Sequence, residues 1–167
     1  LNFYFLWRRR VGSKTWAVVG ALVYVISPYH LAGELYVRGA LAELWSLVWM
    51  PLVLNFIDRT RGPAPYCGIC GVAVSYAALL MTHPPTALIF SCLPIAYVVA
   101  WQSDSPVWMV GLRVSLGLAL GAGLACVYLF PALSMQSLVS VKELTDGFNF
   151  KRSLSWDSSA DVPLLVG

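Results

Sequence analysis

The chain alternates long apolar runs with short polar connections. Within each run the apolar residues are continuous instead of alternating with polar ones, which favours membrane-spanning helices over the strands of a membrane barrel. The runs predict five spans, preceded by the tail of an earlier one at Leu1–Trp7: Val11–Ser27, Gly39–Ile57, Pro63–Met81, Pro85–Trp101 and Pro106–Phe130. A spanning helix needs about 20 residues, so the first and fourth spans are short.

The predicted fold class is therefore all-α, a polytopic transmembrane helix bundle with about five spans and a truncated one. Residues 1–130 form this bundle. From Pro131 onward the sequence mixes charges and serines, which predicts that 131–167 are an extracytoplasmic segment, either a loop or the start of a further domain. Because the chain begins with Leu1 inside an apolar stretch and ends at Gly167 inside another, we expect it to belong to a longer protein whose remaining helices complete the bundle.

Composition agrees with a lipid environment. Hydrophobic residues make up 59% of the chain and charged residues 11%, with a mean hydropathy of +0.72. A soluble domain carries roughly 25% charged residues, so this chain has too few to cover a water-facing surface. The net charge of +3 comes from basic residues scattered among apolar segments, a pattern that does not indicate nucleic-acid binding.

The basic residues predict which ends of the spans face the cytoplasm. One orientation places seven of them inside and four outside, and the excess of positive charge on the cytoplasmic side favours it over the reverse. The seven are Arg8, Arg9, Arg10, Lys14, Arg59, Arg61 and Arg113, and the four are Arg38, Lys142, Lys151 and Arg152. In this orientation both histidines and most of the acids lie together at the outer face, where we expect any functional site.

The first candidate site lies in the stretch 27–43. His30, Glu34 and Arg38 are spaced four residues apart, so a helix would place all three on one face. Glu43 lies a few residues into the next span, where an ionised group usually faces a cavity or a partner. Arg38 could then bind a phosphate while a carboxylate orients a hydroxyl. The alternative is structural: Glu34 and Arg38 form an ion pair that anchors the connection.

His83 is the second candidate. It precedes Pro84 and Pro85 at a predicted helix break on the same side, where a histidine could donate to phosphate or shuttle a proton. The alternative is a capping histidine. Two histidines in distant connections make a poor metal site, so no metal ligand is predicted, and a divalent cation is not indicated. Cys67 and Cys70 lie in an apolar span and are interpreted as small packing residues, and no cofactor is identified.

Several strings in the chain resemble bacterial multipass membrane proteins that share a 6-pyruvoyl-tetrahydropterin synthase-related domain. The matching strings are Ser27–Leu31 (SPYHL), Leu35–Glu43 (LYVRGALAE), Pro51–Leu54 (PLVL) and Leu80–Leu88 (LMTHPPTAL), followed by an outer tail that begins at Pro131. The family name does not imply synthase activity, because that soluble zinc enzyme needs three histidine ligands and the chain has two histidines.

What the resemblance implies is an architecture similar to the GT-C glycosyltransferases. These enzymes transfer a sugar from a polyprenyl-phosphate donor at the outer face of the bacterial cytoplasmic membrane, with an essential acid that would precede Leu1. Arg38, His83, Glu34, Glu43 and His30 are then the expected substrate-binding residues. Two other functions stay open: a non-catalytic membrane protein that binds lipid or a partner complex, and a transporter, which the uncharged centres of the spans disfavour.

Overall fold

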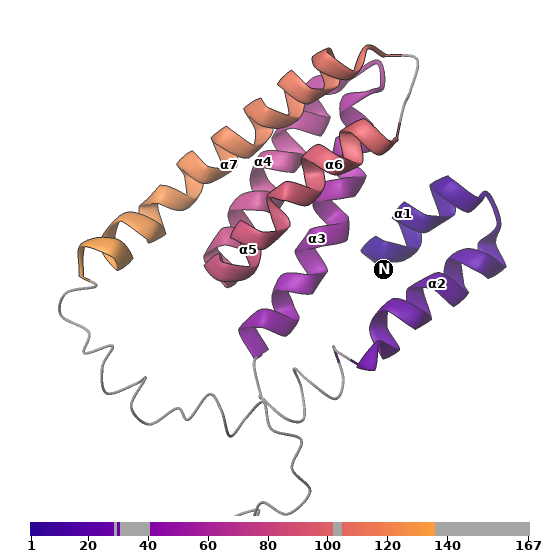
Figure 1. The fold of residues 1–167 in the computed structure, drawn as a ribbon, viewed down its shortest axis with the longest axis horizontal. Coiled ribbons are helices and arrows are strands. Elements are labelled where there is room, and N and C mark those ends of the chain that lie inside the picture. Colours follow the sequence, from indigo (N-terminus) through magenta and orange to yellow (C-terminus); the bar gives the residue numbers. More distant parts are fainter. Residues whose placement is uncertain (29, 31–40, 102–104, 136–167) are drawn as a thin grey trace, which may run out of the picture. The chain divides into compact units, whose positions relative to one another are not determined.

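The computed structural model describes residues 1–28, 30, 41–101 and 105–135, which are helical and contain no strand. The helices are α1 (Asn2–Val11), α2 (Lys14–Ile26), α3 (Leu41–Thr60), α4 (Pro65–Thr82), α5 (Pro84–Phe90), α6 (Cys92–Ala100) and α7 (Val107–Ser134) (Figure 1). The chain divides into two compact units, Leu1–Phe130 and Pro131–Gly167. The first unit contains α1 to α6 and most of α7. The extracytoplasmic placement of 131–167 stays a prediction, because 136–167 lie outside the described residues.

The helices α1 and α2 form a hairpin at the start of the chain. Gly12 joins them with a φ of 72°, a left-handed conformation that glycine adopts without steric cost. The rings of Phe3 and Tyr24 stack across the hairpin, with centroids 4.4 Å apart. The predicted start of the first span is wrong. Arg8–Arg10 form the last turn of α1, where basic side chains are favoured, and the apolar helix that follows begins at Lys14.

The pair α3 and α4 forms the centre of the first unit. Small residues allow the two helices to approach closely: a Cβ added at Gly68 would lie 2.5 Å from the backbone nitrogen of Thr60, and one at Gly71 would lie 2.1 Å from the ring of Phe56. In α4, 56% of the most apolar stretch is buried, against 17% in α7. The core of this unit is therefore built around α4.

Helix α7 packs against α4 through two glycines. A Cβ added at Gly117 would lie 2.8 Å from the side chain of Val72, and one at Gly121 would lie 2.6 Å from the carbonyl oxygen of Ala73. The contact agrees with the Gly-x-x-x-Gly spacing of these two residues, which leaves a helix surface that a neighbouring helix can approach closely. A Cβ at Gly123 would meet nothing within 4 Å, so Gly123 takes no part in the contact.

Pro51 interrupts the hydrogen bonding of α3 near its middle. Proline has no backbone N–H, so the carbonyl of Leu47, four residues earlier, lacks its usual helical donor. The hydroxyl of Tyr24 donates to this carbonyl at 2.8 Å, and the side-chain amide of Asn2 donates to the carbonyl of Val48 at 3.1 Å. The hairpin thus supplies polar partners to α3 in a part of the molecule where lipid could not.

The predicted fourth span, Pro85–Trp101, is divided into the two short helices α5 and α6. Pro94 accounts for the break, because it lacks the N–H that would bond the carbonyl of Phe90. Ser91 lies at the junction, and its hydroxyl is 2.7 Å from the hydroxyl of Tyr76 on α4. The irregular turn between α5 and α6 is therefore held against the central helix.

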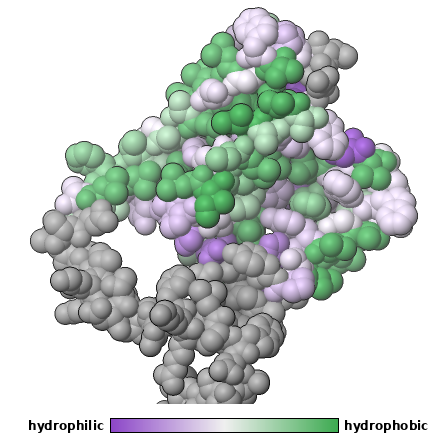
Figure 2. All heavy atoms as spheres, viewed as in Figure 1, coloured by the Kyte–Doolittle hydropathy of each residue, from purple (hydrophilic) through white to green (hydrophobic). Residues whose placement is uncertain are grey.

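Three helices, α3, α4 and α7, are long and apolar enough to cross a membrane, and the other two predicted spans correspond to the shorter apolar helices α2 and α5–α6. Apolar residues also cover much of the face seen in Figure 2. On α7, exposed leucines recur every four residues: Leu112, Leu116, Leu120 and Leu124, with exposed fractions of 65%, 50%, 49% and 55%. Such a stripe marks a surface that faces lipid or protein rather than water. The described residues are thus helical and include three helices that could span a membrane, as a helical membrane protein requires.

Candidate functional site

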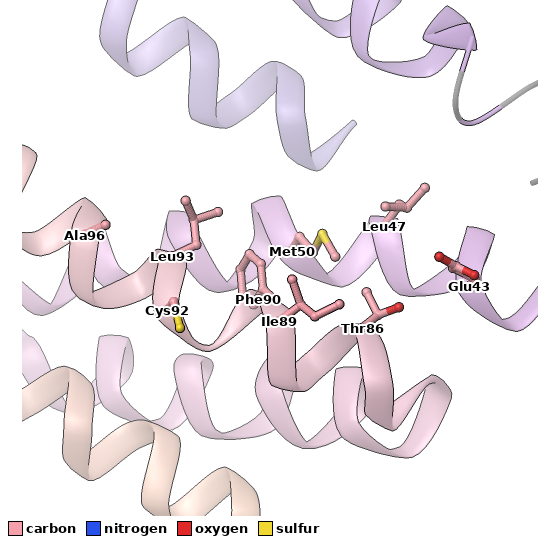
Figure 3. A pocket seen from close by; sticks show the side chains of 9 residues that line it. All are labelled: Glu43, Leu47, Met50, Thr86, Ile89, Phe90, Cys92, Leu93 and Ala96. Carbon is pink, nitrogen blue, oxygen red and sulfur yellow. The ribbon is translucent and has the colours of Figure 1, made fainter. Parts of the chain in front are cut away.

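A groove runs along the surface where α3 meets α5 and α6. Its volume is about 530 Å³, and it is lined by Glu43, Leu47, Met50, Thr86, Ile89, Phe90, Cys92, Leu93 and Ala96. Figure 3 shows Glu43 and Thr86 together at one end and Leu93 and Ala96 toward the other. The groove therefore has one polar end and an apolar length, which suits a molecule with a polar group and a hydrocarbon chain.

His83 lies beside this polar end and begins helix α5. Its ring nitrogen Nδ1 accepts the backbone N–H of Thr86 at 3.3 Å, and the Thr86 hydroxyl lies 2.6 Å from the same nitrogen. Because Nδ1 is the acceptor, a neutral His83 carries its proton on Nε2. The capping role and the donor role that the sequence left open are therefore compatible, since they use different ring nitrogens.

The backbone at the start of α5 offers no donor to an anion. Pro84 and Pro85 have no backbone N–H. The N–H of Thr86 donates to Nδ1 of His83, and the N–H of Ala87 donates to the His83 carbonyl at 3.1 Å. A helix N-terminus often binds phosphate through such groups, but here they are absent or already used. A phosphate at this end would depend on side chains.

Glu43 lies in the first turn of α3 and is half-buried. A carboxylate in this position is favoured by the positive end of the helix dipole. Its backbone carbonyl accepts the hydroxyl of Ser46, a buried residue, at 2.5 Å. The side chain lines the groove together with Thr86, the residue whose backbone N–H bonds His83.

His30 contacts the hairpin instead. Its Nδ1 lies 2.5 Å from the carbonyl oxygen of Tyr24, and its ring meets the Tyr24 ring edge to face at 4.9 Å. It lines a second groove, of about 330 Å³, between α1, α2 and α3. Leu47 lines both grooves, whereas Glu43 lines the first and His30 the second.

Arg38 and Glu34 lie outside the described residues, and so does most of the predicted helix that would stack them with His30. Within the described ranges, no three His, Cys, Asp or Glu side chains group into a metal site. All four cysteines are free and exposed, so the interpretation of Cys67 and Cys70 as packing residues is wrong within this unit.

Two features of the site have weak or no signal in the sequence. Trp49 donates its indole N–H to the hydroxyl of Thr82 at 3.1 Å, which ties α3 to α4 directly before His83. A second polar cluster joins Arg10, Asp58 and Tyr97 near the other end of α3. The sequence could have indicated Asp58, because this acid lies next to arginines in the stretch 58–61. It gives no indication of Tyr97, which lies inside an apolar run.

No protein-family model, no curated protein and no solved structure matches the chain. The resemblance to the pterin synthase-related membrane family therefore stays a prediction.

Proposed function

We propose that the chain forms part of a GT-C-like membrane glycosyltransferase and that its groove holds the donor, a polyprenyl-phosphate sugar. The observation that supports this is the polarity of the groove. Thr86 and Glu43 form one end, and along α3 the lining extends from Glu43 to Met50, roughly 10 Å at 1.5 Å per residue. The apolar part would hold the lipid chain and the polar end its phosphate.

Each predicted residue has a defined role in this proposal. Arg38 binds the donor phosphate, and the Nε2–H of His83 is a second donor, since its Nδ1 is already engaged. Glu43 or Glu34 holds these groups in position. The reaction is an inverting sugar transfer at the outer face. Exclusion of water at the bilayer rim strengthens each of these contacts.

A pair of substitutions at His83 tests the phosphate contact. Asparagine is a preferred N-cap residue, so His83→Asn keeps an acceptor for the Thr86 N–H and removes the Nε2 donor. Losing one hydrogen bond to a charged group is expected to weaken binding of a labelled polyprenyl-phosphate sugar about tenfold, with stability unchanged. His83→Ala should lose about 1 kcal/mol of stability in addition. Full donor binding by His83→Asn would refute the contact.

A second pair tests the lipid end of the groove. Ala96→Trp would fill the groove, whereas Val99→Trp places the same ring on an exposed position of α6 that does not line it. We expect Ala96→Trp to abolish donor binding and Val99→Trp to retain it. Equal binding by the two variants would show that the lipid chain lies elsewhere.

A non-catalytic lipid-binding protein is the second candidate function. The engagement of His83 in capping α5 favours it, because this residue then has a structural reason to be present. Both functions predict donor binding in the groove, and only the first predicts transfer. Binding of the labelled donor without sugar transfer by the intact protein, supplied with acceptor, would support the second function.

The proposal also requires the groove's polar end to face outward from the bacterial cytoplasmic membrane. Helix α4 is one of the three candidate spans, and Gly62 and Pro85 lie beyond its two ends. Cysteines introduced at these positions, with the native cysteines replaced by serine, should react with a membrane-impermeant thiol reagent from opposite sides. Reaction of Gly62→Cys from the outside of intact cells would reverse the orientation and remove the outer site.

A further inference from the structure

At the end of α3 remote from Glu43, two arginines converge on one aromatic pair. Roughly 20 Å of helix rise separates Glu43 from Asp58, so this cluster is distinct from the groove's polar end. The guanidinium carbon of Arg10 lies 5.1 Å from the ring centroid of Tyr97 and 4.4 Å from that of Trp101. The guanidinium carbon of Arg61 lies 5.8 Å from the ring centroid of Tyr97. The ends of α1, α3 and α6 thus meet around two cations.

The positive charge in this cluster exceeds the negative charge. Arg10 forms an ion pair with Asp58, whose carboxylate also accepts the Tyr97 hydroxyl at 3.1 Å. Both members of the ion pair are largely buried, with side-chain exposures of 15% and 14%. Arg61 donates to the backbone carbonyl of Trp101 and has no carboxylate partner among the residues that the structure describes. One acid therefore faces two guanidinium groups.

Within the part of the chain that the structure describes, three guanidinium nitrogens of the cluster are buried without an acceptor. They are Nε of Arg10 and both Nε and Nη2 of Arg61. Buried donors are nearly always paired, and leaving a charged one unpaired is costly. Nε and Nη2 of one guanidinium form the two-pronged fork that binds two oxygens of a carboxylate or phosphate. The free atoms are thus the ones suited to an oxyanion.

We propose that Arg61, with Arg10 beside it, binds the phosphate of an anionic phospholipid. The cluster lies where apolar helices end, the depth at which headgroups lie, and the half-exposed Trp101 fits the same interface. Basic pockets between membrane helices recognise anionic headgroups in this way. The phosphate oxygens accept the unpaired N–H groups, and the lipid charge balances the surplus cation. This site is independent of the sugar-transfer proposal.

A pair of glutamine substitutions separates a built site from general positive charge. Arg61→Gln removes the fork, whereas Arg59→Gln removes the same charge two residues earlier, from an exposed side chain whose guanidinium lies over Phe56. The full chain in mild detergent is titrated with phosphatidylglycerol, with phosphatidylcholine and with inorganic phosphate, and binding is followed by the shift in melting temperature. We expect phosphatidylglycerol to stabilise the unsubstituted chain and Arg59→Gln equally, and to bind Arg61→Gln about tenfold more weakly.

Three results would overturn the proposal. Equal loss of binding in Arg59→Gln would indicate diffuse charge, and an equal effect of phosphatidylcholine would indicate a non-selective lipid contact. Saturation by inorganic phosphate at the same concentration would indicate a soluble anion instead of a lipid. If Arg61→Gln does not fold, Arg61→Lys keeps the charge without the fork and should lose most of the lipid-induced shift; full retention would exclude the fork.

Discussion

The hydrogen bond from Tyr24 to α3 yields the sharpest prediction about stability. The Tyr24 hydroxyl lies 2.8 Å from the carbonyl of Leu47, the group that Pro51 leaves without a helical donor. Tyr24→Phe removes the hydroxyl and keeps the ring that stacks on Phe3. The substitution therefore isolates one hydrogen bond and leaves the packing of the hairpin in place.

The expected cost follows from the environment of that carbonyl. A neutral hydrogen bond contributes about 0.5–1.5 kcal/mol to stability in water-soluble proteins, and measured values between membrane helices average about 0.6 kcal/mol with a maximum near 1.7. From these values we expect Tyr24→Phe to cost about 1 kcal/mol. Reversible unfolding in mixed detergent micelles measures this value. Tyr128→Phe, on an exposed position of α7, is the control and should change stability by only a few tenths.

The physical reason for this cost can be tested by restoring the missing donor. In a Pro51→Ala background the backbone N–H of residue 51 can bond the Leu47 carbonyl, so the loss of the Tyr24 hydroxyl should cost little. A double-mutant cycle should then give a coupling energy of about 1 kcal/mol between the two positions. If Tyr24→Phe costs the same in both backgrounds, the hydroxyl does not compensate for the proline and the reasoning fails.

Two further substitutions test contacts elsewhere in the first unit. Gly121→Ala would place a Cβ 2.6 Å from the Ala73 carbonyl and force α4 and α7 apart, so we expect a loss of about 1–3 kcal/mol in the same unfolding assay. Gly123→Ala meets open space and should be neutral or slightly stabilising; equal effects would contradict the glycine contact. Asp58→Asn leaves Arg10 with an uncompensated, largely buried charge and should lower stability by about 2 kcal/mol in the same unfolding assay. Adding Arg10→Met removes that charge and should recover part of the lost stability. No recovery in the double variant would contradict the charge argument.

The helical membrane fold could be predicted because hydrophobicity alone determines it. Continuous apolar runs with few charges have one stable arrangement in lipid, and α3, α4 and α7 lie where those runs predict. The glycine contact was predictable for a similar reason, since Gly117 and Gly121 recur at helical spacing and leave a smooth surface. Both inferences depend only on local sequence and on the properties of the solvent.

The wrong predictions concern features that depend on which other residues a side chain or carbonyl contacts in the folded chain. Arg8–Arg10 look like a connection because they are charged, yet they complete the last turn of α1, where the helix dipole favours cations and Asp58 pairs with Arg10. The break between α5 and α6 was missed although Pro94 is visible in the sequence, because many membrane helices tolerate an internal proline, as α3 tolerates Pro51. Whether a proline divides a helix depends on which neighbours satisfy the freed carbonyl.

Glu43 and the His83 region illustrate how far the candidate site could be predicted from the sequence. Each residue could be singled out because an ionisable side chain in an apolar segment needs a reason to be there. The sequence could not show that Thr86 joins them, since a threonine in an apolar helix is ordinary. Nor could it show that the Nδ1 of His83 caps α5 and so leaves Nε2 as the donor. Which ring nitrogen caps the helix, and which one stays a donor, depends on the backbone geometry of the turn.

Helix α6 connects the two proposed sites through consecutive residues. Ala96 lines the apolar end of the groove, and Tyr97 donates to Asp58 in the basic cluster. The groove lies between α3 and α6, so its width depends on how firmly α6 is held against α3. Asp58 on α3 accepts the hydroxyl of Tyr97 on α6, while the turn at Ser91 secures the other end of α6 to α4. The ion pair therefore helps to set the shape of the groove although none of its atoms lines it.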